Sequence, residues 1–94
     1  MAWPALRRDS ATMAELTVAE TLPRVYRRVL DAVGRLEQLG GRQEAARFRA
    51  AAIRAYSGPW DAASQGRLED VAARTEAAAL DRERRERREQ PRVA

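Results

Sequence analysis

The feature that most constrains this chain is a run of large apolar residues at helical spacing that stops at Gly40-Gly41. Residues three or four positions apart share one face of an α-helix, so the run predicts an amphipathic helix that begins at Thr21. The Thr21 hydroxyl can cap the helix, and Pro23 then falls in the first turn, where a missing N–H costs little. The glycine pair lets the chain reverse. The run comprises Leu22, Val25, Tyr26, Val29, Leu30, Val33, Leu36 and Leu39.

Two further helices are predicted after the glycines. The second, over residues 42–56, carries Ala45, Phe48, Ala52 and Tyr56 on one face. Most of its packing is expected to come from Phe48, Ile53 and Tyr56. Ser57-Gly58-Pro59 ends this helix, and Pro59 suits the first position of a third, with Asp61 near its positive end and Gly66 able to delay the regular helix until about Arg67. The apolar face of this third helix can pack on the hairpin or pair with another chain. It comprises Leu68, Val71, Ala72, Thr75, Ala78 and Ala79.

The two ends of the chain differ from its centre. Residues 1–12 show no periodic apolar pattern and contain Pro4, and we expect residues 1–20 to form a flexible, disordered N-terminal segment. Thr17 and Glu20 have the spacing of a capping box, so a short helical turn can precede Pro23. Residues 81–90 carry five Arg and four acids, and this balance favours a solvated helical extension over a nucleic-acid arm, ended by Pro91. We therefore expect an all-α fold in which an antiparallel helical hairpin and a third helix form a domain over residues 21–80, followed by a charged extension over residues 81–94.

The apolar residues are mostly small. Alanine accounts for 20 of the 94 residues, whereas Leu, Ile, Val and Phe together number only 16. Small side chains let helices approach closely but bury little area each, so the predicted core is thin. We expect self-association or a partner protein to complete it. No run approaches the ~20 apolar residues of a membrane span, and no signal peptide is evident, so we expect a cytoplasmic protein without membrane contact.

The residue types that are missing argue against an enzyme. The sequence has no His, Cys, Lys or Asn. It therefore offers no imidazole base, thiol nucleophile, Schiff-base lysine or Cys/His zinc site, and its few hydroxyls have no amine or imidazole to activate them. We expect no catalytic residues, no metal site and no cofactor.

The charge pattern leaves an alternative function open. All 18 basic residues are Arg, and the net charge is +4. Arg24, Arg28 and Arg35 follow helical spacing away from the apolar stripe, with Asp31 between them and Arg27 near the edge. Such a basic ridge can meet nucleic-acid phosphates, an acidic protein or only water, and nucleic-acid binding is the less favoured reading.

Two short segments resemble a known family. Val25-Tyr26-Arg27, followed by Arg28, Val29 and Leu30, resembles the opening of LYR-motif proteins, which are small three-helix chains. Ile53-Arg54-Ala55-Tyr56 is similar to the Ile-Arg pair and nearby aromatic that the family carries on its second helix. The resemblance implies a non-catalytic adaptor with an acyl carrier protein as partner. It also implies that an acyl chain enters beside Val29, Val33 and Phe48, with Arg27 or Arg28 on the carrier's acidic surface.

Together these patterns predict a small non-enzymatic helical interaction module, an adaptor or assembly factor. Its partner is another protein or a second copy of this chain. The alternative is an Arg-rich protein that binds the phosphate backbone of nucleic acid. The residues expected at the core or interface are Leu22, Val25, Tyr26, Arg27, Arg28, Val29, Phe48 and Trp60.

Overall fold

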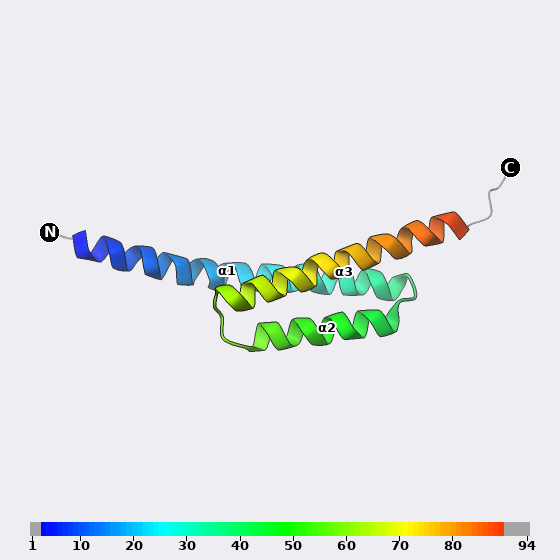
Figure 1. The fold of residues 1–94 in the computed structure, drawn as a ribbon, viewed down its shortest axis with the longest axis horizontal. Coiled ribbons are helices and arrows are strands. Elements are labelled where there is room, and N and C mark those ends of the chain that lie inside the picture. Colours follow the sequence, from blue (N-terminus) through cyan, green and yellow to red (C-terminus); the bar gives the residue numbers. More distant parts are fainter. Residues whose placement is uncertain (1–2, 90–94) are drawn as a thin grey trace.

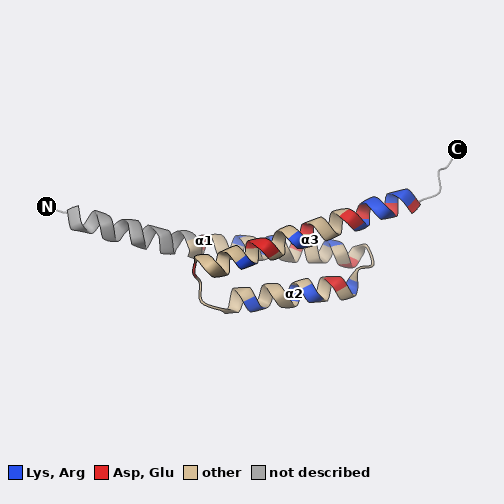
Figure 2. Cartoon of the chain, viewed as in Figure 1, with Lys and Arg blue, Asp and Glu red and all other residues tan. Residues whose placement is uncertain are grey.

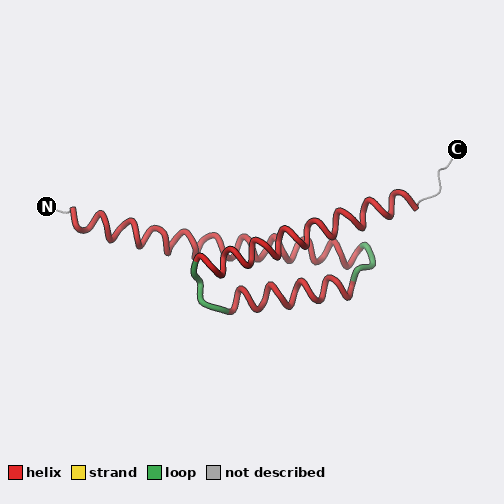
Figure 3. The backbone as a smooth tube through the Cα atoms, in the orientation of Figure 1, coloured by secondary structure: helices red, strands yellow, loops and turns green. Residues whose placement is uncertain are grey.

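Three helices make up the computed structural model, which describes residues 3–89 and the side chains of residues 18–89. Helix α1 spans Trp3–Gln38, α2 spans Arg42–Ser57 and α3 spans Ala62–Glu89, joined by two short loops (Figures 1 and 3). Helix α2 returns antiparallel to α1, α3 runs parallel to α1, and each helix contacts the other two. The predicted all-α class is confirmed. Of the two alternatives for the third helix, packing on the hairpin is the one found.

The turn between α1 and α2 is closed by the glycine pair. Gly40 has a φ of +88°, its N–H bonds to the carbonyl of Glu37, and the N–H of Gly41 bonds to the carbonyl of Leu36. This pair of bonds is a Schellman motif, which satisfies carbonyls at the helix end. Helix α3 then covers the turn: a Cβ at Gly41 would lie 2.5 Å from Nε of Arg82. The predicted chain reversal at the glycines is therefore confirmed, and the second glycine also permits close contact with α3.

Helix α3 begins at Ala62, not at Pro59 as the sequence predicted. Asp61 caps it, because Oδ1 of Asp61 accepts a bond of 2.8 Å from the backbone N–H of Ser64. A side-chain cap satisfies an N–H of the first turn, which proline at the first position cannot do. Gly66 lies inside the regular helix and does not delay it. Helix α3 continues without a break past residue 80, whereas the end predicted at Pro91 lies outside the described residues.

The predicted start of the first helix at Thr21 is wrong, because the backbone is helical from Trp3 and Pro23 lies inside α1. Proline at this position removes one helical hydrogen bond, the one to the carbonyl of Ala19. Ala19 and Pro23 both lie on the exposed face, where water can bond to that carbonyl. The predicted flexibility of residues 1–20 is a separate property, and it stays a prediction.

The core is asymmetric, with its large side chains concentrated on one helix. Almost all of its large aliphatic side chains come from α1, and Leu68 of α3 is the exception. Helices α2 and α3 supply mainly small residues, so they pack closely against the larger face of α1. Phe48, Tyr26, Tyr56 and Val71 are partly buried against this core. The buried members are Leu22, Val25, Val29, Ala32, Val33 and Leu36 of α1, Ala45, Ala52 and Ala55 of α2, and Ser64, Leu68, Ala72, Thr75 and Ala79 of α3.

One packing expectation fails. Ile53 was predicted to supply much of the packing of α2, but its side chain is 45% exposed. The buried face of α2 passes through Ala52 and Ala55, and Ile53 lies next to that face but outside it. The packing area of α2 comes instead from the partly buried Phe48 and Tyr56.

Candidate interaction surface

The predicted interaction residues do not form one patch. Leu22, Val25 and Val29 are buried in the core, where no partner reaches them without opening the bundle. Tyr26 and Phe48 are partly buried at its edge. Arg27, Arg28 and Trp60 are exposed. Only the exposed and partly buried members are therefore candidates for direct contact with a partner.

Three aromatic side chains form a stack at the end of the bundle where α2 leads into α3. The rings of Tyr26 and Tyr56 are nearly parallel, with centroids 4.3 Å apart. Trp60 tilts by 39° against Tyr56 at a centroid distance of 5.2 Å, and its Nε1 donates a 2.8 Å hydrogen bond to the carbonyl of Tyr56. Trp60 is nevertheless 45% exposed. The aromatic stack, defined as Tyr26, Tyr56 and Trp60, thus holds an exposed tryptophan against two partly buried tyrosines.

Sequence reasoning selected Tyr26 and Trp60 separately but missed the stack. A usable signal was present, since Tyr26 and Tyr56 lie 15 residues before and after Gly41. In an antiparallel hairpin, residues equidistant from the turn lie at the same height along the paired helices. The two tyrosines are also the residues that carry the resemblance to LYR-motif proteins, and in this fold they contact each other.

The predicted basic ridge on α1 is partly occupied by α3. Nε and Nη2 of Arg28 each donate a 2.8 Å hydrogen bond to the carboxylate of Glu76, and Nη2 of Arg35 lies 2.6 Å from Oε1 of Glu83. The hydrogen bond from Arg28 lowers the pKa of Glu76, and the same bond raises the pKa of Arg28. The bond from Arg35 likewise lowers the pKa of Glu83. Two of the three ridge arginines therefore have carboxylate partners within the chain.

These two ion pairs repeat with a seven-residue period on both helices. Arg28 and Arg35 are seven residues apart on α1, as are Glu76 and Glu83 on α3. The buried residues of α1 follow the alternating three- and four-residue spacing of a coiled-coil seam, and the arginines lie beside it. We call this pair of contacts the Arg–Glu ladder. It is the arrangement expected where two parallel helices share a heptad register.

Other charges are also paired inside the chain. Arg49 contacts Glu37 across the hairpin, and Arg82 contacts Glu44 beside the turn. Along the exposed C-terminal part of α3, basic and acidic residues alternate (Figure 2). Contacts one turn apart join Asp81 to Arg85 and Glu83 to Arg87. This part of α3 therefore has the internal charge pairing of a solvated helix.

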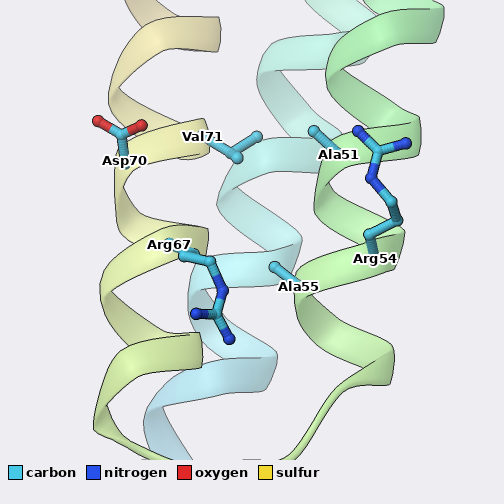
Figure 4. Close-up of a pocket in the computed structure, with 6 residues that line it drawn as sticks. All are labelled: Ala51, Arg54, Ala55, Arg67, Asp70 and Val71. Atoms are coloured by element: carbon cyan, nitrogen blue, oxygen red, sulfur yellow. The ribbon is translucent and has the colours of Figure 1, made fainter.

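A groove with a different character runs between α2 and α3. Ala51 and Ala55 point from α2 toward α3, and Val71 and Arg67 point back toward α2 (Figure 4). Arg54 lies at the α2 edge, while Asp70 points away from the groove. Sequence reasoning missed this α2–α3 groove, because no local pattern reveals which sides of two helices face each other. The α2–α3 groove is defined by Ala51, Arg54, Ala55, Arg67, Asp70 and Val71.

The described part of the chain contains no group of three or more potential metal-ligating side chains. None of the helices within residues 3–89 is both long and apolar enough to cross a membrane. The aromatic stack and the α2–α3 groove are candidate surfaces for recognition.

Comparisons of the chain with protein-family models, with curated proteins and with solved structures found no match. The resemblance to LYR-motif proteins consequently stays a prediction.

Proposed function

We propose that this chain is a small non-enzymatic interaction module, an adaptor or assembly factor that binds another protein through its aromatic stack. The observation that carries the proposal is Trp60, which is 45% exposed although two contacts hold it in place. Tryptophan is strongly enriched among the residues that dominate binding energy at protein interfaces. A side chain that is already ordered loses little conformational freedom on binding, so its apolar area contributes more to affinity. A cytoplasmic location remains part of this proposal.

The thin core gives a second reason to expect a partner. Helices α2 and α3 bury mainly alanine, and each alanine removes little apolar area from water. A ligand that binds only the folded state adds to its stability by mass action. A partner that covers the aromatic stack therefore also stabilises the bundle, and a second copy of this chain would do the same.

Native mass spectrometry on tagged protein purified gently from its own host tests this proposal. We expect a stoichiometric protein mass with the wild-type chain, loss of that mass with Trp60→Ala, and its retention with Trp60→Phe, which keeps an aromatic ring. Leu80→Ala is the matched control, because Leu80 is 47% exposed but lies on α3 outside the stack. Far-UV circular dichroism of each variant separates loss of binding from loss of fold.

Each outcome of this experiment has a distinct meaning. A partner retained by Trp60→Ala, or lost equally with Leu80→Ala, contradicts the role of the stack. A homodimer that dissociates in Trp60→Ala identifies a second copy of the chain as the partner. A bound mass that nuclease removes favours the nucleic-acid alternative, for which the ridge has less free charge than the sequence suggested because Arg28 and Arg35 are paired.

A further inference from the structure

We infer that the α2–α3 groove is a docking site for an acidic amphipathic helix of a partner protein. This inference rests on the proposed function and deepens it, because it names a second contact surface and the chemistry of the segment that fits it. The groove lies between α2 and α3, whereas the aromatic stack joins α2 to α1. The two surfaces therefore differ in their helix pairs and can be tested separately.

The floor of the groove is apolar and built for close approach. Ala51 and Val71 remain only partly buried, and the buried Ala55 lines the groove one turn further along α2 (Figure 4). Small side chains let the backbone of another helix come near, as they do between α1 and its neighbours in this bundle. A further helix laid along this groove would extend the three-helix unit to four, an arrangement in which helices pack at shallow angles around one core.

Each edge of the groove carries an arginine that forms no salt bridge within the part of the chain whose side chains are described. Arg54 borders it on α2 and Arg67 on α3. Nη2 of Arg67 donates to the Ser64 hydroxyl at 3.0 Å, but no carboxylate within residues 18–89 lies within 4.0 Å of either guanidinium. The one lining acid, Asp70, already contacts Arg74 at 3.0 Å. The two edges thus contrast with the Arg–Glu ladder, where the same residue type is paired within the chain.

This combination selects the chemistry of the occupant. An apolar floor calls for Leu, Ala or similar side chains on one face of the incoming segment. Two guanidinium groups on opposite edges call for carboxylates on both flanks of that face, because a guanidinium forms paired hydrogen bonds with a carboxylate. An α-helix supplies this pattern when acidic residues border an apolar stripe. Nucleic acid offers phosphates but no apolar stripe, so the floor would stay uncovered.

A designed peptide tests the inference on the full chain. The probe is a fluorescein-labelled 21-residue helical peptide with Leu and Ala on one face and Glu along both flanks; its matched counterpart carries Lys at each Glu position. Fluorescence anisotropy at physiological salt reads binding. We expect the Glu peptide to bind at least about tenfold more tightly than the Lys peptide, and Arg54→Glu/Arg67→Glu to weaken it by about tenfold or more.

A second charge-reversed variant controls for the change in the net charge of the protein. Arg24→Glu/Arg84→Glu makes the same change in net charge at two exposed positions, on α1 and on the C-terminal part of α3, outside the groove. We expect it to alter affinity for the Glu peptide by less than about threefold, since exposed charges far from the contact are screened. Circular dichroism establishes that both variants are folded before affinities are compared.

Several outcomes overturn the inference. Equal affinity for the two peptides, no binding of the Glu peptide at 100 µM, or equal losses in the two charge-reversed variants would each do so. A single-stranded 30-nucleotide DNA that binds the wild type and loses affinity in Arg54→Glu/Arg67→Glu would assign the two arginines to phosphate recognition instead. If the Trp60-dependent complex persists while the groove result is negative, the groove fails and the proposed function stands. Loss of both contradicts the proposed function as well.

Discussion

Gly34 and Gly40 lie six residues apart near the C-terminal end of α1, yet their backbones differ. Gly34 is helical and a Cβ there would meet no atom within 4 Å, whereas Gly40 has equally open space but a φ of +88°. Alanine favours the helical conformation by about 0.5–1 kcal/mol over glycine, and it pays about 1–2 kcal/mol in the left-handed region. We predict that Gly34→Ala raises the free energy of unfolding and that Gly40→Ala lowers it by these amounts, measured by urea denaturation.

The pair of substitutions contains its own control, because the same methyl group is added in both. A loss of stability in Gly34→Ala would show that the space beside this residue is needed by the packed helices. An unchanged midpoint in Gly40→Ala would show that the turn adopts another conformation and that the Schellman motif is not required.

Ile53, Tyr56 and Trp60 show which properties of single residues could be predicted from the sequence. Helical spacing correctly placed Ala45, Ala52 and Tyr56 toward the bundle. The packing role predicted for Ile53 came from the size of its side chain, and that prediction is wrong. The position of a residue around the helix decides its burial here, because the buried face of α2 passes through Ala52 and Ala55 and leaves Ile53 outside. The stack with Trp60 depends on the loop that returns the chain after α2, and local spacing carries no information about that return.

Between elements, the Arg–Glu ladder fixes how α1 and α3 lie side by side. We predict that Glu76→Arg destabilises the protein by about 0.5–1 kcal/mol, because it places a second cation against Arg28, and that adding Arg28→Glu restores most of the loss. The expected loss of stability is small because the side chains of Arg28 and Glu76 are both nearly half exposed, so water screens their interaction. A double-mutant cycle of chemical denaturation midpoints measures the coupling.

Glu86→Arg is the matched control for this cycle. Glu86 is an exposed acid on α3, three residues beyond Glu83 and therefore outside the seven-residue period of the ladder, and it contacts no arginine of α1 within the described residues. We expect Arg28→Glu to add independently to Glu86→Arg. Coupling of the same size in both cycles would mean that overall charge, not the ladder, sets the effect.

Helix boundaries were less predictable than helix faces. The all-α class, the hairpin and the reversal at Gly40-Gly41 followed from apolar period and glycine position, and all are present. The helix starts predicted from the proline positions are wrong, because Pro23 lies inside α1 and Pro59 lies before the Asp61 cap of α3. Proline suits the first turn of a helix but does not fix where the helix begins, because an upstream helix can continue through it, as at Pro23, and a later residue can cap the helix, as Asp61 does.

At the scale of the whole molecule, the ion pairs depend on how closely the helices pack in the core. Helix α1 contributes the large apolar face, and the alanines of α2 and α3 bring their backbones close enough for arginines beside the seam to meet acids across it. The basic ridge was therefore visible in the sequence of α1, but its neutralisation was not, because the partners lie 48 residues away on α3. Arg54 and Arg67 at the α2–α3 groove form no salt bridge with any residue whose side chain the structure describes, and Trp60 is 45% exposed.

The same ion pairs predict how the stability of the whole molecule depends on pH. Hydrogen bonds from Arg28, Arg35 and the Ser64 backbone lower the pKa values of Glu76, Glu83 and Asp61, respectively. Each of these carboxyls therefore binds fewer protons in the folded state than in the unfolded state near pH 4, so stability rises with pH through that window. We predict a free energy of unfolding that is nearly constant above about pH 5.5 and falls as the pH drops through about 4.5 toward 3.

Denaturation of the wild type and of Glu76→Gln/Glu83→Gln between pH 3 and pH 7 measures this dependence. Glutamine keeps the size of the side chain but removes the titrating charge, so the variant should be less stable at pH 7 and should lose less on acidification. The two curves should then approach each other at pH 3, where the wild-type carboxyls are largely protonated in the unfolded chain. Parallel curves over the whole range would show that other groups carry the acid dependence and that the Arg–Glu ladder contributes little to holding α3 against α1.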